Sequence, residues 1–172
     1  DLYEMTQEMT TAAGLPAYEI SNHAVIGQEC RHNLTYWTAA DWIGVGPGAH
    51  GRFAVFDPKR ECLSRTSTTI RRSPTGWLGA IKTMGHGIEK KEVDTTQGWA
   101  HEMVMMGLRL RDGIYLDVIE ALCGSVENWL DFTAVQQCVD SGWLYHDHNT
   151  SRIVTTSDGR LRLNYILSAI LR

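Results

Sequence analysis

The stretch from residue 18 to residue 51, YEISNHAVIGQECRHNLTYWTAADWIGVGPGAHG, holds the most distinctive pattern in the chain. At its start, residues 17–21 alternate and place their apolar side chains on one face, which is typical of a half-buried strand. At its end, residues 42–48 (WIGVGPG) predict a short apolar strand that runs into a glycine-dense turn. A helical pattern ended by Gly14 precedes the first strand, and helix, turn and strand in this order predict an α/β unit.

The residues between these strands, 22–40, show no clean period, so we expect a long irregular connection of the kind that often carries function. This connection contains His32, whose neutral imidazole is a good iron ligand, and Asn33, which could fix the orientation of that ring by a hydrogen bond. Tyr36 and Trp37 offer flat apolar surface on which a porphyrin could lie. These residue types fit a haem-binding segment, but they also fit a structural histidine with aromatic neighbours, because most histidines bind no metal.

Helical and strand patterns flank this region. Residues 2–13 have helical spacing from the start and no initial methionine, so we expect a chain that is cut inside a helix. The next expected elements are strands at 54–56 and 63–70 and a helix that begins at Pro74 and ends at Gly85–Gly87. The charged segment 89–94 (EKKEVD) is expected to be an exposed boundary between domains.

The remainder of the chain predicts a mainly helical domain. The expected helices are 96–110, 115–123, 125–139 and a last one capped by Thr156, and the expected strands are 143–146 and 153–155. Three helices, a two-stranded wing and a closing helix predict a winged-helix-like layout. We therefore expect two domains, residues 1–91 and residues 92–172.

Charge is distributed unevenly between the two predicted domains. Residues 1–91 contain ten Lys and Arg against nine Asp and Glu, whereas residues 92–172 contain six against eleven. Between Asp112 and Ser151 there is no Lys or Arg, so a winged helix here would repel DNA, whose phosphates require cations. We expect no nucleic-acid partner and a module that docks on protein.

The four cysteines, Cys30, Cys62, Cys123 and Cys138, form neither a C-x-x-C pair nor the close triplet that holds an iron–sulfur cluster. We expect free buried thiols, because disulfide frameworks are mainly found in short secreted chains. The sequence contains no run of about 18 apolar residues, and its first residues lack the pattern of a signal peptide. We therefore expect a cytoplasmic protein without a transmembrane segment.

Three consecutive segments, YEISNHA at 18–24, ECRHNLTYW at 29–37 and WIGVGPGAHG at 42–51, resemble in order and spacing a known family. This is the family of the oxygen-independent coproporphyrinogen III oxidases and their haem-chaperone relatives. GLRLRDG at 107–113 and LRLN at 161–164 resemble the C-terminal domain of the same radical S-adenosylmethionine (SAM) group. Within that group, the H-N-x-x-Y-W pattern is characteristic of the haem-chaperone branch, where it is associated with haem binding.

The resemblance implies an α/β fold, and the chain as a whole would be classed as α+β. The last strands and helix of an incomplete radical SAM (β/α) barrel, around residues 17–22 and 42–48, would be followed by the winged-helix-like domain. In the family, an N-terminal C-x-x-x-C-x-x-C loop binds a [4Fe-4S] cluster, which cleaves S-adenosylmethionine. This sequence has none of that loop, so the resemblance implies a C-terminal portion that is catalytically inactive alone. Its partners would be a tetrapyrrole, the missing N-terminal barrel segment and haem-accepting proteins.

The resemblance also implies roles for individual residues. Those expected at haem are His32, with its imidazole on the iron, Asn33, Tyr36 and Trp37. Those expected to line a SAM or tetrapyrrole pocket are Glu19, Gly44, Gly46 and Gly48. Glu19 also fits an ordinary exposed charge, and Pro47 argues against phosphate binding by the glycines because proline removes a backbone donor.

Other candidate residues have plainer interpretations. His50 could face the same pocket, although a local hydrogen bond in the turn explains it as well. His146 and His148 lie on one side of an extended segment with no third ligand at suitable spacing, which indicates a solvated wing tip. The methionines at 103, 105 and 106 have helical spacing and indicate packing rather than a metal site.

Three functions fit the sequence. The HNLTYW run favours a haem-binding chaperone of the radical SAM group. The same scaffold fits an enzyme that oxidatively decarboxylates the propionates of coproporphyrinogen III, and the fold does not separate these two functions. A winged-helix protein-interaction module is the alternative from another class.

Overall fold

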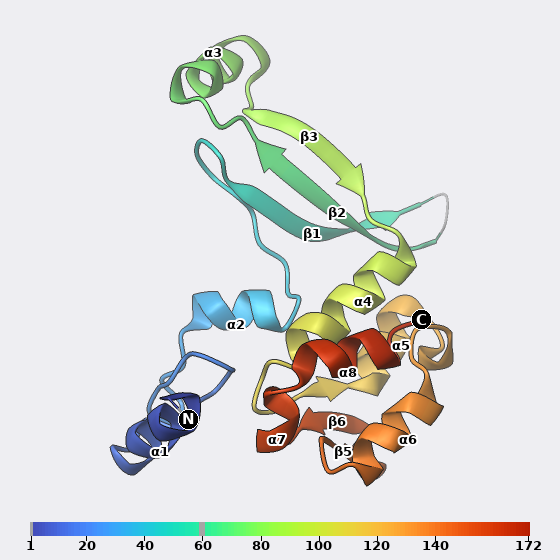
Figure 1. Ribbon diagram of the computed structural model, residues 1–172. Helices are drawn as coiled ribbons and strands as arrows, with labels where there is room; N and C mark the ends of the chain where they lie inside the picture. Colours follow the sequence, from blue (N-terminus) through green and yellow to red (C-terminus); the bar gives the residue numbers. More distant parts are fainter. Residues whose placement is uncertain (1, 59–60) are drawn as a thin grey trace. The chain divides into compact units, whose positions relative to one another are not determined.

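The computed structural model describes residues 2–58 and 61–172 and contains two compact units (Figure 1). One unit joins the residues up to 39 with residues 100–172, and the other consists of residues 40–99. This division differs from the expected boundary between residues 91 and 92. The reason is that the N-terminal segment bonds to the C-terminal one: Arg111 N–H donates to the Tyr18 carbonyl over 2.9 Å, and Glu19 forms a β-bridge with Leu110.

The unit of residues 40–99 is built on an antiparallel sheet in the order β1-β2-β3. Its elements are β1 (His50–Asp57), β2 (Cys62–Ile70), α3 (Pro74–Met84) and β3 (Ile88–Val93). The two expected strands and the helix beginning at Pro74 are thereby confirmed. The segment expected to be a domain boundary is instead β3, whose backbone pairs with β2 while its charged side chains remain exposed. Charges on an edge strand discourage pairing with other chains.

A buried arginine organises the interior of this unit. Arg65 on β2 is 1% exposed, and its guanidinium lies 5.7 Å from the ring centre of Trp42 and 5.5 Å from that of Trp99. Asp41 approaches the same guanidinium at 3.5 Å. The cation is thus held between two aromatic faces, a favourable arrangement when water is excluded.

The other unit is mainly helical, with a small antiparallel sheet in the order β4-β6-β5. Its elements are α1 (Leu2–Ala12), α2 (Arg31–Trp37), the C-terminal part of α4 (Thr96–Gly107), β4 (Ile114–Tyr115), α5 (Leu116–Cys123), a 3₁₀ turn (Val126–Asn128), α6 (Phe132–Asp140), β5 (Leu144–Asp147), β6 (Arg152–Thr155), α7 (Ser157–Arg160) and α8 (Leu163–Ile170). Its core includes five fully buried side chains, those of Val104, Leu108, Ile153, Ile166 and Ile170. Thr156 acts as an N-cap, as expected, by accepting from Gly159 N–H, but the single last helix expected after it is divided into α7 and α8.

The helix expected over residues 125–139 is divided into the 3₁₀ turn and α6. The division occurs at Asp131, whose carboxylate accepts hydrogen bonds from Thr133 N–H and Ala134 N–H and thereby starts a new helix. The Ala134 N–H, together with Thr133 N–H and nearby Arg172, lowers the pKa of this carboxyl below its ordinary value. The apolar residues have the spacing of one continuous helix, but the N-cap at Asp131 divides it into two.

The strands expected at 17–22 and 42–48 are present only as isolated β-bridges. Ala17 bridges His23, Glu19 bridges Leu110, and Trp42 bridges Arg52. An extended segment becomes a strand only when a neighbour supplies a continuous ladder, and the described residues do not supply one at these positions. The irregular connection expected over 22–40 is also wrong in part, because it contains α2.

The expectation of buried thiols is half correct. Cys123 and Cys138 are buried, and burial raises the pKa of the Cys138 thiol, whereas Cys30 and Cys62 are exposed. All four are free thiols. Every helix in the described part of the chain is too short or too polar to span a bilayer.

Candidate functional site

Helix α2 carries the HNLTYW motif and presents two faces that differ in their contacts. His32 and Tyr36 lie one turn apart on one face, with ring centroids 4.8 Å apart in an edge-to-face arrangement at 85°. Asn33 lies on another face, where its side-chain amide donates to the Tyr18 hydroxyl over 3.2 Å. The structure therefore brings together His32 and Tyr36, and separately Asn33 and Tyr18.

The expected hydrogen bond from Asn33 to the His32 ring is not formed. Consecutive residues on a helix point about 100° apart, so Asn33 contacts Tyr18 instead. The His32 side chain is exposed, and among residues 2–58 and 61–172 its interaction is the ring contact with Tyr36. The imidazole is thus held on one edge by an aromatic ring while its nitrogens remain accessible.

Trp37 occupies the inner side of the same helix. It follows His32 by five residues, which places it about 140° away around the helix axis. The Arg109 guanidinium lies 5.2 Å from the centre of its ring, and its indole N–H is buried without a hydrogen-bond partner in the described part of the chain. Trp37 therefore packs inward and does not form one continuous flat surface with His32 and Tyr36.

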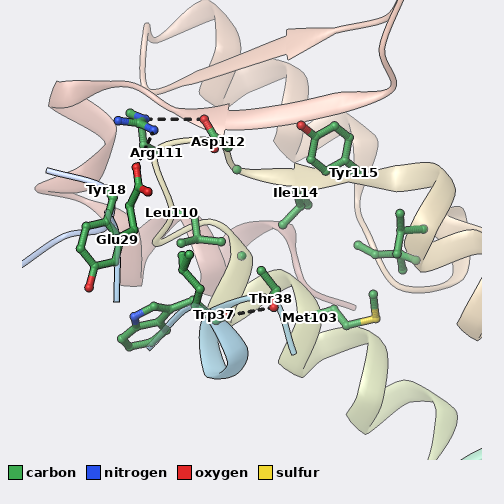
Figure 2. Close-up of a pocket in the computed structure, with 15 residues that line it drawn as sticks. Tyr18, Glu29, Trp37, Thr38, Met103, Leu110, Arg111, Asp112, Ile114 and Tyr115 are labelled. Atoms are coloured by element: carbon green, nitrogen blue, oxygen red, sulfur yellow. Dashed lines mark hydrogen bonds and ion pairs between the residues drawn. The ribbon is translucent and has the colours of Figure 1, made fainter. Parts of the chain in front are cut away.

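A pocket of about 470 Å³ lies behind α2, within the unit that joins the two ends of the chain (Figure 2). Leu34, Trp37 and Thr38 line it from α2. The remaining wall is contributed by Tyr18, Glu29, Met103, Gly107, Leu110, Arg111, Asp112, Gly113, Ile114, Tyr115, Val118 and Ile119. His32 and Tyr36 are absent from this lining, so the exposed face of α2 and the pocket are different surfaces.

One side of the pocket is charged. Figure 2 shows Arg111 beside Asp112 and Glu29, with Leu110 and Ile114 lower in the cavity. The Arg111 guanidinium lies 3.6 Å from a Glu29 carboxylate oxygen and 3.7 Å from one of Asp112. Backbone N–H groups of Glu29 and Gly27, followed by Arg111, lower the pKa of the Glu29 carboxyl. Sequence reasoning missed this pocket, although the GLRLRDG segment that supplies Arg111 and Asp112 was noted as part of the family resemblance.

Glu19 is neither exposed nor part of this pocket. Its side chain is 1% exposed. One of its carboxylate oxygens accepts hydrogen bonds from Ser21 N–H, Ser21 Oγ and Asn22 Nδ2. This carboxylate therefore fixes the turn that follows Glu19 and is satisfied there.

The three glycines expected to line a pocket belong to the unit of residues 40–99, whereas His32 belongs to the other unit. A Cβ at Gly44 would lie 2.3 Å from the His50 carbonyl oxygen, so this glycine permits close backbone approach. Gly46 and Gly48 have φ values of 97° and 74°, which favour glycine in the turn. His50 begins β1 and contacts the neighbouring strand β2, with its Nδ1 3.4 Å from Thr69 Oγ1, rather than a partner within the turn.

The methionines of α4 show ordinary helix packing: Met103 is 9% exposed and Met105 is 40% exposed. No group of three or more His, Cys, Asp or Glu side chains in the described ranges 2–58 and 61–172 is arranged to hold a metal ion. The exposed face of α2 with His32 and Tyr36, and the pocket behind it, are two features of the described residues that could bind a ligand.

No family model matches the chain. The chain is similar to heme chaperone HemW of Escherichia coli, with 31% identity over 99% of the chain and 42% of that protein, and to heme chaperone HemW of Mycobacterium tuberculosis, with 30% identity over 98% and 38%. It is also 30% identical to the mitochondrial radical S-adenosyl methionine domain-containing protein 1 of Bos taurus, over 88% of the chain and 35% of that protein. The chain thus spans about two fifths of the length of these relatives.

One solved structure shares the fold. The coproporphyrinogen III oxidase (HemN) of Escherichia coli, described as a radical SAM enzyme, superposes with a TM-score of 0.65 at 13% identity. The match covers 96% of this chain and 39% of that structure. The correspondence therefore extends through both units of the chain, at the level of fold.

Proposed function

We propose, from the premise that the chain belongs to the radical SAM family of the oxygen-independent coproporphyrinogen III oxidases and haem chaperones, that it forms part of a haem chaperone. In this proposal His32 on α2 is the iron ligand and Tyr36 supports the porphyrin. The observation that carries it is the exposed imidazole in a T-shaped contact with Tyr36. The names of the bacterial relatives support a chaperone, since they are heme chaperones HemW.

The residues present fit haem in their chemistry. A histidine imidazole is a common axial ligand of haem iron, and an exposed helical position leaves room for a flat macrocycle. Tyr36 fixes the edge of the His32 ring and adds an apolar face one turn along α2. When bound, haem supplies redox-active iron, and this chain's part is to hold and orient it. Trp37 would support the site indirectly, by fixing α2 against Arg109.

The cysteines of the chain do not fit an iron–sulfur cluster. Cys123 and Cys138 are buried, and Cys30 and Cys62 belong to different units. We therefore derive no SAM-cleaving step from the residues of this chain. Residues 17–22 and 42–48 form isolated β-bridges here, and in this proposal they lie where the family's barrel ends, with the C-terminal helices and β4-β6-β5 sheet as a winged-helix-like domain.

An alternative within the same family is a coproporphyrinogen III dehydrogenase, which the solved HemN structure represents. The HNLTYW motif on an exposed helix favours the chaperone, because an iron ligand is of use only for a metallated porphyrin. A protein-interaction role for the C-terminal helices is favoured by their acidity and by the absence of Lys and Arg between Asp112 and Ser151.

Titration with ferric haem tests the proposed function. The chain should produce a shifted Soret band, and His32→Ala should weaken binding at least about tenfold, because an iron–imidazole bond of even about 1.4 kcal/mol is lost. His86→Ala is the matched control, since His86 is also exposed but lies in the other unit, and it should bind as the unsubstituted chain does. An unchanged Soret shift in His32→Ala would show that His32 is not the iron ligand.

A further inference from the structure

Two histidines at the end of the edge strand β5 lie against each other. His146 is on β5, and His148 is the first residue after the strand ends at Asp147. Their ring centroids are 4.0 Å apart with the planes tilted by 44°. On its other side, the His146 ring contacts Phe132 of α6, with centroids 6.2 Å apart. His146 is half-buried and His148 is exposed, so the pair is open to solvent from one direction.

The surroundings keep the His146 imidazole in the form that binds metal. Burial, followed by the charge of His148, lowers the pKa of His146, while Asp147 acts in the opposite direction. Asp147 leaves the opposite face of β5, and its carboxylate accepts from Asn149 N–H at 2.9 Å and Thr150 Oγ1 at 2.8 Å. At neutral pH, His146 therefore presents a neutral ring, whose free nitrogen lone pair is a ligand for borderline metal ions.

We propose that His146 and His148 form a two-histidine chelate for a divalent transition-metal ion, with water completing the coordination. This site is separate from the haem-binding face of α2 and does not depend on the proposed function. Because the protein supplies only these two ligands, a bound ion would exchange with free metal in solution and would not be a tightly bound structural ion. The same two residues looked like a solvated wing tip in the sequence, because sequence spacing gives no distance between rings.

The ring separation is close to that of a chelate. Two imidazoles bound at neighbouring positions of one ion, each at about 2.0–2.1 Å, have ring centroids roughly 4.5 to 5 Å apart. The observed separation of 4.0 Å is slightly shorter, so a small rotation of the exposed His148 ring away from His146 would bring both nitrogens to one ion. Phe132 limits the movement of His146 and thereby reduces the entropy lost on binding.

Among divalent ions, copper(II) should bind most tightly. Imidazole suits copper, nickel and zinc, and affinities for a given nitrogen site peak at copper. The two histidines provide two neighbouring equatorial ligands of a tetragonal copper site. The oxygen-preferring ions magnesium and calcium should not bind here, because the pair offers them no carboxylate.

The experiment is a copper(II) titration of the full chain, without haem, followed by electron paramagnetic resonance and by thermal unfolding. The expected result is a nitrogen-ligated copper signal that saturates near one equivalent, together with a rise in Tm. His148→Gln should weaken copper binding at least about tenfold, which is about 1.4 kcal/mol. His148 is the better position to substitute, because it is exposed and its loss leaves the contact between His146 and Phe132 intact.

Two further variants make the outcome decisive. His146→Gln should weaken binding to a similar extent, and His86→Gln, which changes an isolated exposed histidine of the other unit, should leave it unchanged. Equal losses in all three variants, or unchanged binding in His148→Gln, would overturn the proposal. If haem does not bind but copper(II) binds as expected, the proposed function is contradicted and the metal-site proposal is not.

Discussion

The Gly113→Ala variant should lose at least about 3 kcal/mol of unfolding free energy, among the largest effects expected of a single added methyl group. Gly113 has φ of 70°, and an alanine Cβ there would lie 2.1 Å from the Ile153 carbonyl oxygen. The left-handed conformation alone costs about 1–2 kcal/mol for a residue with a side chain. The clash with the Ile153 carbonyl adds to this cost. A backbone group cannot rotate out of the way as a side chain can, so the pairing of Ile114 with Ile153 must open.

Gly142→Ala is the matched control for this prediction. Gly142 belongs to the same unit and has φ of 74°, but a Cβ there meets no atom within 4 Å. It should therefore show only the conformational cost of about 1–2 kcal/mol. Guanidinium unfolding followed by far-ultraviolet circular dichroism measures both variants. Equal losses in the two would mean that the turn at Gly113 does not depend on its close approach to β6.

The second large effect is expected at Arg65. Arg65→Ala should cost about 3 kcal/mol, because two cation–π contacts are lost and the space between Trp42 and Trp99 is left partly empty. Relief of the buried charge offsets part of this cost. Asp41 contributes little to the difference, since its side chain is 54% exposed. Tryptophan fluorescence during urea unfolding reports the change in stability, because both rings that contact Arg65 are indoles.

Arg52→Ala provides the comparison for a surface arginine. Arg52 lies on the neighbouring strand β1, is 36% exposed and faces Asp94 at 3.6 Å. An ion pair of this kind contributes about 0–1 kcal/mol, so its removal should hardly move the transition. Arg65→Met separates packing from charge: it refills the space but lacks the cation, and should recover only part of the loss. Full recovery in Arg65→Met would show that the guanidinium charge is dispensable.

Local signals predicted much of the fold correctly. The helix α3 begins at Pro74 and ends at Gly85, as expected, and Gly85 has φ of 77°. Ser73, which was not among the expected caps, accepts from Gly76 N–H. These features depend on neighbours within a few residues, so the sequence contains all the information they need. The β5–β6 hairpin and the capping of α7 by Thr156 were predictable for the same reason.

Features that depend on distant residues could not be predicted. The packing of the N-terminal segment with the C-terminal helices depends on the contact of Tyr18 with Arg111, which lie far apart in the sequence. The pocket behind α2 combines residue 18 with residues from 29–38 and 103–119, so no single motif outlined it. The charged segment over β3 looked like a linker because edge strands tolerate charged side chains on exposed positions.

The motif HNLTYW pointed to the correct family, but the positions of its side chains were not predicted. In an extended loop His32, Tyr36 and Trp37 could surround one ligand, whereas in a helix they divide between two faces. This division narrows the proposed haem contact to His32 and Tyr36 and assigns Asn33 and Trp37 to anchoring α2. The roles of residues in a short motif therefore depend on the secondary structure that carries it.

Side-chain nuclear magnetic resonance with gallium(III) protoporphyrin, a diamagnetic porphyrin that accepts an axial ligand, tests the central claim most directly. The account predicts that the imidazole signals of His32 and the ring signals of Tyr36 move most on binding. The indole N–H of Trp37, buried on the inner side of α2, should move little. Large changes at Trp37, Leu110 and Tyr115 with an unmoved His32 would place the porphyrin in the pocket and contradict the account.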